Sequence, residues 1–188
     1  MSNLKELTWE HHKDAERQQF VKVLMSGKIN PELYATYLWN QHKKYDLLEA
    51  LAGALGLLDD LPDIRRKQKI EKDFLELWKL DSPPTITNST AHYINHMKDI
   101  MTDRNAIMAH VYVLHMGDLS GGQMIARKAP GSGEMYKFDT DKKELKESIR
   151  AKINDDMAEE AKYCFTASTN LFKELMELDI EPYLEQAD

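Results

Sequence analysis

The sequence predicts an all-α protein, and three observations lead to this prediction. Leu, Lys, Glu, Ala and Met dominate the 188 residues, and all five favour helices. The chain has only four valines, and segments in which apolar and polar residues alternate, as they do in half-buried strands, are hard to find. Glycine, proline and short polar residues interrupt the apolar pattern at intervals that suit seven or eight helices. We therefore expect no β-sheet.

The expected helices have recognisable starts and ends. The first covers residues 4–25 and stops at Ser26 and Gly27. Asn30 followed by Pro31 is typical of an N-cap with proline in the first turn, and the helix that it starts runs towards Leu57. Further helices are expected at residues 63–80, 87–101, 105–116, 123–128, 142–154 and 156–178.

Composition limits the class of protein. The length suits one domain over residues 1–188, with a core at about 4–178 and a C-terminal tail at 179–188. A net charge of −7 argues against general nucleic-acid binding, which needs a basic surface. A lone cysteine, Cys164, cannot form an internal disulfide, so a reducing compartment is expected. No apolar run is long enough for a signal peptide or a membrane span, and we expect a cytoplasmic monomer.

Three glycines lie within six residues of an otherwise helical segment. Each of Gly117, Gly121 and Gly122 should cost about 1 kcal/mol relative to alanine in a helix interior, so their presence needs a reason. They allow a helix to kink, or allow its backbone to approach something flat and large. The spacing GxxxGG is neither a phosphate loop nor a dinucleotide fingerprint. Taken alone, this spacing fits a tight helix–helix crossing at least as well as it fits close approach to a ligand.

The first helix carries a second candidate site. Lys5, Trp9, His12 and Glu16 follow one another at offsets of four, three and four residues, which places them on one stripe of a helix. A carboxylate one turn from a histidine can orient the ring and raise its basicity as a metal ligand. The alternative is an amphipathic surface helix with a simple Glu–His contact.

Two further pairs have helical spacing. His92 and His96 stand four residues apart and can share a metal on one helix face, but no third ligand is near them in the sequence. Lys146 and Arg150 have the same spacing and can clamp carboxylates of a ligand. A solvated basic face is the alternative for the second pair.

Three segments together carry a family resemblance that covers most of the chain. Residues 4–16 are similar to a proximal helix that ends in His-His-Lys-Asp-Ala-Glu. Residues 117–123, Gly-Asp-Leu-Ser-Gly-Gly-Gln, match a distal-helix motif nearly letter for letter. Residues 159–172 resemble the last core helix of the same family. In this order and separation, they make the sequence resemble the haem oxygenases, which open haem to biliverdin.

The resemblance implies a single-domain helical fold in which haem lies between a proximal helix and a kinked distal helix. It implies that His12, and not His11, is the axial iron ligand, and that Glu16 accepts a hydrogen bond from the other ring nitrogen. The other implied roles are close backbone approach at Gly117 and Gly121, a cofactor contact at Gly122, water binding by Asp118 with support from Tyr45 and Tyr112, propionate binding by Lys5, Lys146 and Arg150, and lining of the distal side by Phe165 and Phe172.

The activity implied by the resemblance is the opening of haem b at a meso carbon, with O2, to biliverdin (the IXα isomer is expected), carbon monoxide and ferrous iron. Lack of the membrane tail of the animal enzymes makes the chain resemble the bacterial, algal or phage branch, which takes electrons from ferredoxin. A downstream bilin reductase is a further expected partner. The alternatives are a haem carrier or sensor without turnover, a helical enzyme of similar architecture that acts without iron, and a helical interaction module.

Overall fold

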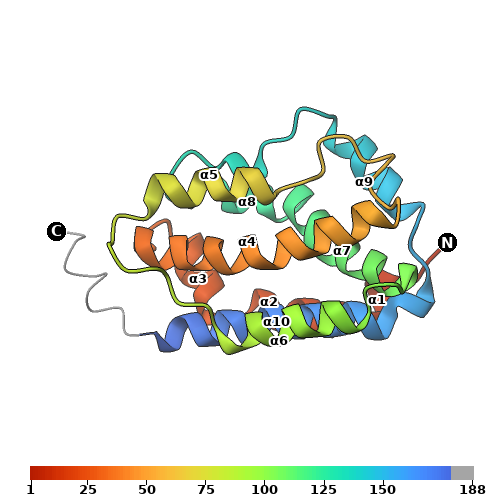
Figure 1. The fold of residues 1–188 in the computed structure, drawn as a ribbon, viewed down its shortest axis with the longest axis horizontal. Coiled ribbons are helices and arrows are strands. Elements are labelled where there is room, and N and C mark those ends of the chain that lie inside the picture. The colour runs from red at the N-terminus through yellow and green to blue at the C-terminus, as the bar shows by residue number, and fades with distance from the viewer. Residues whose placement is uncertain (179–188) are drawn as a thin grey trace.

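Helix α4 runs through the middle of the molecule, and the other helices pack around it (Figure 1). In this computed structural model, residues 1–178 are described, and all regular elements within them are helical, as the sequence predicts. Helices α6 and α10 lie side by side along one face of α4, and α5 covers the opposite face. The helices are α1 Leu4–Leu7, α2 Trp9–Glu16, α3 Gln19–Met25, α4 Pro31–Ala54, α5 Lys67–Leu77, α6 Asn88–Asp99, α7 Arg104–Leu119, α8 Gly122–Ile125, α9 Lys142–Arg150 and α10 Ala158–Glu177, with short 3-10 turns η1 Glu134–Tyr136 and η2 Asp155–Met157.

The N-terminal segment differs from the single helix expected at residues 4–25, because it is broken twice. At the first break, the buried hydroxyl of Thr8 donates to the carbonyl of Leu4 at 2.8 Å, and the Thr8 backbone leaves helical geometry. Such side-chain bonds compete with the helix ladder. At the second break, Gln18 is extended, with ψ of 147°. The result is three short helices, of which α2 carries His12.

Helix α4 begins as predicted and ends earlier than predicted. The side chain of Asn30 accepts hydrogen bonds from the backbone of Glu32 and Leu33 at 2.9 and 3.2 Å, and Pro31 opens the first turn. At the other end, Gly56 has φ of +73°, and the backbone N–H of Leu57 donates to the carbonyl of Ala52 at 2.9 Å. This is a Schellman cap, which stops the helix at Ala54 instead of near Leu57.

The predicted break at the glycines is displaced by three residues. Helix α7 starts at an Asp103 cap, which accepts from the backbone of Ala106 at 3.0 Å, and it continues through Gly117. It ends at Ser120, whose φ and ψ of −115° and −93° are not helical, and α8 resumes at Gly122. A single glycine with helical neighbours therefore does not interrupt the ladder, whereas the Ser120-Gly121 pair does.

The C-terminal elements bring the last part of the chain back across the fold. Asp141 caps α9 by accepting from the backbone of Glu144 at 3.1 Å, and α9 packs on α7. Helix α10 then packs against α2, α3, α6 and α7. The single-domain organisation remains a prediction, because the expected tail at 179–188 lies outside the described residues. Within residues 1–178, no helix has the length and apolar character that crossing a membrane demands.

Candidate functional site

The predicted His12–Glu16 pair lies on the surface of α2. The Nε2 atom of His12 is 2.8 Å from a carboxylate oxygen of Glu16, and the Nζ atom of Lys13 is 3.0 Å from the other oxygen. The His12 side chain is 38% exposed, so its ring remains accessible to a ligand. Trp9, one turn earlier, meets the His12 ring edge-on at 5.9 Å between centroids.

The two phenylalanines of α10 have different neighbours, and one of them contacts the predicted iron ligand. The ring of Phe165 stacks on His12, with 5.0 Å between centroids and 14° between planes, so it lies on the proximal side and not on the distal side. Phe172 stacks on Phe20 at 5.5 Å and is 6.1 Å from Tyr37. The expectation of a distal lining is therefore corrected for Phe165, because the packing of α10 on α2 brings its ring to the histidine.

The three glycines of the motif have two different surroundings. A Cβ atom on Gly117 or Gly121 would meet no other atom within 4 Å, and both residues are exposed. A Cβ atom on Gly122 would lie 2.6 Å from the ring of Tyr136 and 3.2 Å from the carbonyl oxygen of Gly117. Gly117 and Gly121 thus face open space, whereas Gly122 is required by packing inside the protein.

These surroundings predict opposite effects of alanine on stability. Gly117→Ala should raise the free energy of unfolding of the ligand-free protein by up to ~1 kcal/mol, because alanine favours a helix interior and the new methyl group meets nothing. Gly122→Ala should lower it by ~1–3 kcal/mol, because Tyr136 must move. Urea denaturation of both variants measures the difference. Equal destabilisation by the two variants would contradict the conclusion that Gly117 faces open space and that Gly122 is packed against Tyr136.

Asp118 is buried beside the open glycines. The hydroxyl of Tyr45 donates to its Oδ2 atom at 2.7 Å, and Tyr45 is itself buried. Burial raises the pKa of Asp118 to about 7, against the lowering effects of His115, the Tyr45 hydrogen bond and Arg66. Burial also raises the pKa of Tyr45 well above its ordinary value, so this hydroxyl remains a donor. A carboxyl group with these partners exchanges protons near neutral pH.

Tyr112 lies one turn before Met116, on the half-buried side of α7. Burial raises its pKa, the positive charge of Arg150 lowers it, and the negative charge of Glu6 raises it. The pKa of Tyr112 therefore responds to charges on both α1 and α9.

The three predicted cations remain without carboxylate partners. Lys5 and Arg150 are exposed and Lys146 is half-buried, and none of the three is in an ion pair within the part of the chain that the structure describes. The Nζ atom of Lys5 lies 6.0 Å from the centroid of the Trp9 ring. Unpaired cations near a shared face can bind an anionic ligand.

Residues 1–177 match the family model described as "Heme oxygenase". The chain belongs to this family. It is 28% identical to Heme oxygenase 1 of Rattus norvegicus, over 98% of this chain and 74% of that protein. It is 29% identical to Heme oxygenase 2 of the same organism, over 92% of this chain and 64% of that protein.

Solved haem oxygenases have the same fold as this family member. The heme oxygenase of Leptospira interrogans superposes with a TM-score of 0.79 at 26% identity, covering 91% of this chain and 97% of that chain. Heme oxygenase-1 of the cyanobacterium Synechocystis, in complex with heme, superposes with a TM-score of 0.79 at 24% identity, covering 98% and 93%. The fold predicted from the sequence is thereby confirmed.

Sequence reasoning missed a polar network behind Asp118. Glu49 of α4 accepts from Nε2 of His115 at 2.8 Å and from the backbone N–H of Arg66 at 2.6 Å. The fully buried Arg66 side chain donates to the carbonyls of Met135 and Lys137 at 3.0 and 2.7 Å. His115 precedes Asp118 by three residues, a helical spacing that could have identified it. The partners on other elements have no such signal.

Proposed function

We propose that this haem oxygenase opens haem b (protohaem IX) at a meso carbon to biliverdin, carbon monoxide and ferrous iron, using O2 and an external electron donor. The observation that carries the proposal is the pairing of Asp118 and Tyr45 at 2.7 Å, buried directly beside Gly117, whose missing side chain leaves open space. A carrier needs neither a buried carboxyl group of pKa about 7 nor an open backbone next to it. The alternative of a haem carrier or sensor is therefore less well supported.

The residues fit a haem group. His12 offers an accessible imidazole, and Glu16 can hold one ring nitrogen while the other binds iron. Phe165 and Phe172 contribute aromatic surface, and the unpaired cations Lys5, Lys146 and Arg150 suit propionates. Haem, when bound, supplies the iron that binds and activates O2 as well as the ring that is opened.

The distal residues would control orientation and protons. Gly117 and Gly121 would let the backbone approach a bound haem more closely than a side chain would allow, and so would orient it in the site. Asp118, held by Tyr45, positions a water and moves a proton without acting as a strong acid. Tyr112 supports the same water network. Gly122 is now proposed to fix the helix turn through Tyr136 and not to contact the ligand directly.

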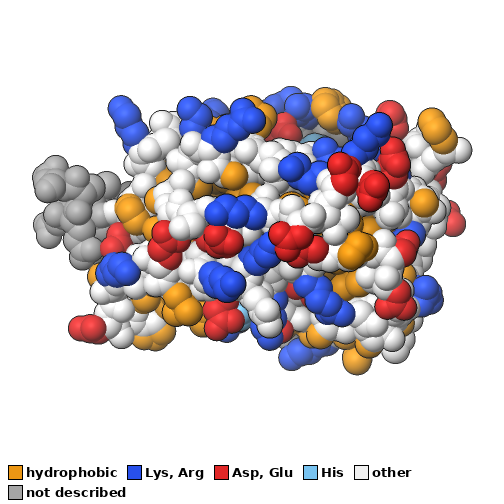
Figure 2. Space-filling view, turned by 90° about the horizontal axis from the view of Figure 1, so that it is seen from above, with side chains coloured by type: hydrophobic (Ala, Val, Ile, Leu, Met, Phe, Trp, Pro, Cys, Tyr) orange, Lys and Arg blue, Asp and Glu red, His pale blue; other side chains and the backbone are white. Residues whose placement is uncertain are grey.

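The electron donor is proposed to be ferredoxin or a similar reductant. On the face seen in Figure 2, side chains of both signs are interspersed, which is compatible with several protein partners. We further propose that the protein works as a cytoplasmic monomer and that a bilin reductase consumes its product. These proposals follow the family resemblance alone.

Haem titration followed by turnover tests the proposed function. The protein should bind one haem, and addition of ferredoxin with its reductase, or of ascorbate, should remove the Soret band and yield biliverdin with carbon monoxide. Stable binding without loss of the Soret band under both reductants would indicate a carrier or sensor. Failure to bind haem would favour a helical enzyme that acts without iron.

The propionate contacts lead to a separate prediction. Replacing both Lys146 and Arg150 with alanine should weaken haem binding by about 10-fold, or should mix the biliverdin isomers, because the charged pair would fix the rotation of the ring in its plane. Chromatography of the extracted biliverdin measures the isomers. The matched control is Lys142→Ala together with Lys143→Ala, which removes two exposed cations from the start of the same helix. A single isomer at normal affinity would remove Lys146 and Arg150 from the site.

A further inference from the structure

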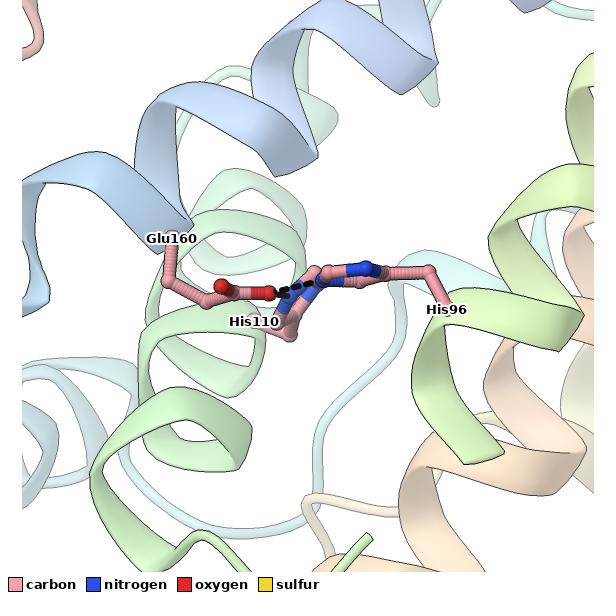
Figure 3. Close-up of side chains that lie close together, drawn as sticks. All are labelled: His96, His110 and Glu160. Atoms are coloured by element: carbon pink, nitrogen blue, oxygen red, sulfur yellow. Dashed lines mark hydrogen bonds and ion pairs between the residues drawn. The ribbon is translucent and has the colours of Figure 1, made fainter. Parts of the chain in front are cut away.

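A second cluster of ligating side chains lies away from His12 and Asp118. His96 of α6, His110 of α7 and Glu160 of α10 point toward one another from three helices (Figure 3). One ligand atom from each lies within 4.8 Å of the others, and within residues 1–178 no other three His, Cys, Asp or Glu side chains are grouped in this way. His110 Nε2 is 2.7 Å from Glu160 Oε1, and His96 Nε2 contacts the same oxygen.

The cluster is pre-organised by its own neighbours. The ring of Tyr163 stacks on His96 at 3.8 Å between centroids. The hydroxyl of Tyr93 is 2.8 Å from Nδ1 of His110, and both side chains are fully buried. When His110 donates from Nδ1 to the Tyr93 oxygen, its Nε2 lone pair faces Glu160 and can bind a cation placed between the two side chains. Such outer contacts commonly fix the tautomer and orientation of metal-binding histidines.

The three side chains of the cluster differ in their exposure to solvent. His110 is fully buried, whereas His96 and Glu160 are 24% and 21% exposed. The exposed members leave a path for an ion, and a hollow of about 430 Å³ between α6 and α10 lies one helical turn away, lined by His92 and Tyr163. The positive charge of the buried Lys44 acts on His110 and opposes a cation here, whereas the negative charge of Glu160 favours one.

We propose that His96, His110 and Glu160 form a binding site for one divalent transition-metal ion, with Zn²⁺ as the representative ion. Two imidazoles and one carboxylate are a donor set that binds zinc with a fourth position left open. Metal–ligand bonds of about 2.0–2.1 Å in a tetrahedron separate the ligand atoms by about 3.3 Å. The ligand atoms lie within 4.8 Å of one another, so a bound ion would require Glu160 to withdraw from its present contacts with the two histidines.

This site is not the pair suggested by sequence spacing. His92 and His96 have the helical offset, but His92 lines the neighbouring hollow instead of joining the cluster. The true partners of His96 come from α7 and α10, which are 14 and 64 residues away along the chain. The proposed metal site therefore stands on tertiary contacts and does not depend on the proposed haem chemistry.

Zinc titration of the full chain, with a chromophoric chelator as competitor, tests the proposal. Wild-type protein should bind one Zn²⁺, and Co²⁺ in its place should show the intense visible absorption of a tetrahedral site. His96→Ala and Glu160→Gln should each weaken Zn²⁺ binding at least 10-fold, with circular dichroism confirming that both variants are folded. Tyr93→Phe should weaken it by about 10-fold, as loss of an outer contact does elsewhere.

Two control variants separate this site from other histidines. His92→Ala removes the neighbouring histidine on the same helix, and His12→Ala removes the proposed iron ligand, so both should keep Zn²⁺ affinity within about twofold. Binding that survives Glu160→Gln and His96→Ala, or that disappears in His12→Ala, would overturn the proposal. Absence of any bound Zn²⁺ in the wild-type titration would overturn it as well.

Discussion

Asp118→Ala is expected to retain haem binding and to lose ring opening. The carboxyl group is buried and bonded to Tyr45, and it is the titratable group nearest to the open backbone at Gly117. Positioned acid–base groups contribute roughly 10²–10⁴-fold to rate, so biliverdin formation should fall by about 100-fold or more. The haem that remains intact should show increased peroxidase activity, because a disordered water network no longer directs the reaction to the ring.

The measurement is single-turnover absorbance at equal haem occupancy, with biliverdin quantified by extraction. Asp139→Ala provides a matched control, since it removes an exposed carboxylate that is not part of the Asp118–Tyr45 pair. Tyr45→Phe removes the hydroxyl that holds Asp118 and should give a smaller loss than Asp118→Ala. An unchanged biliverdin yield in Asp118→Ala would exclude the proposed role.

Asp118→Asn adds a test that is independent of activity. Burial raises the pKa of Asp118 from 3.8 to about 7 in the folded protein, so the folded state holds this proton more tightly than the unfolded state does. The stability of the wild-type protein should therefore fall as pH rises from about 4 to about 7, by up to ~4 kcal/mol from this group. Asparagine stays neutral at every pH in this range, so the Asp118→Asn variant does not lose stability by ionising a buried group.

Urea denaturation from pH 5 to pH 8 checks the sign. The asparagine variant should gain stability relative to the wild-type protein as pH rises, because only the wild-type carboxyl group must ionise in a buried position. A difference that is constant with pH would mean that Asp118 does not titrate in this range. This outcome would also remove the reason to expect proton exchange at neutral pH.

Local signals predicted the helix starts well because the responsible bonds are local. Asn30 and Asp141 cap the helices expected to start at residues 31 and 142 by accepting from a backbone N–H two or three residues ahead, whereas an Asp103 cap starts α7 at Arg104 instead of at residue 105. Such a bond depends on neighbours in the sequence and is readable from it. The same reasoning identified α4 and the overall all-helical class.

Breaks within helices were less predictable, because the helical and non-helical conformations differ little in free energy at these positions. The segment at residues 4–25 has continuous helical periodicity, yet the backbone leaves helical geometry at Thr8, whose hydroxyl also donates to the carbonyl of Leu4. The glycine motif indicated a kink, but Gly117 remains helical and the break occurs at Ser120. Differences of about 1 kcal/mol decide such boundaries, and tertiary packing can supply them.

Long-range partners could not be derived from spacing alone. Phe165 reaches His12 from α10, and Arg66 reaches the Asp118 surroundings from the segment before α5. Both depend on how distant helices pack, which the sequence pattern does not specify. The family resemblance identified Asp118 and Tyr45 together, and their 2.7 Å contact agrees with that expectation without testing their catalytic role.

His12→Ala is expected to abolish the absorption spectrum of histidine-ligated haem. Among the two adjacent histidines, only His12 lies 2.8 Å from Glu16 and stacks on Phe165, and these contacts can hold an imidazole in one orientation for an iron ion. Haem can still enter through apolar and propionate contacts, so its affinity should fall by about 10-fold or more while the protein remains folded. Turnover should then be lost.

His11→Ala is the matched control, because it removes a neighbouring imidazole of the same helix that takes part in neither contact. It should keep the wild-type spectrum, and added imidazole should restore histidine-like absorption in His12→Ala by occupying the vacated space beside Phe165. Electronic absorption and electron paramagnetic resonance of the ferric complex measure both effects. If His11→Ala loses the ligand spectrum and His12→Ala retains it, the assigned ligand is wrong by one residue, and the contact with Glu16 is only a surface ion pair.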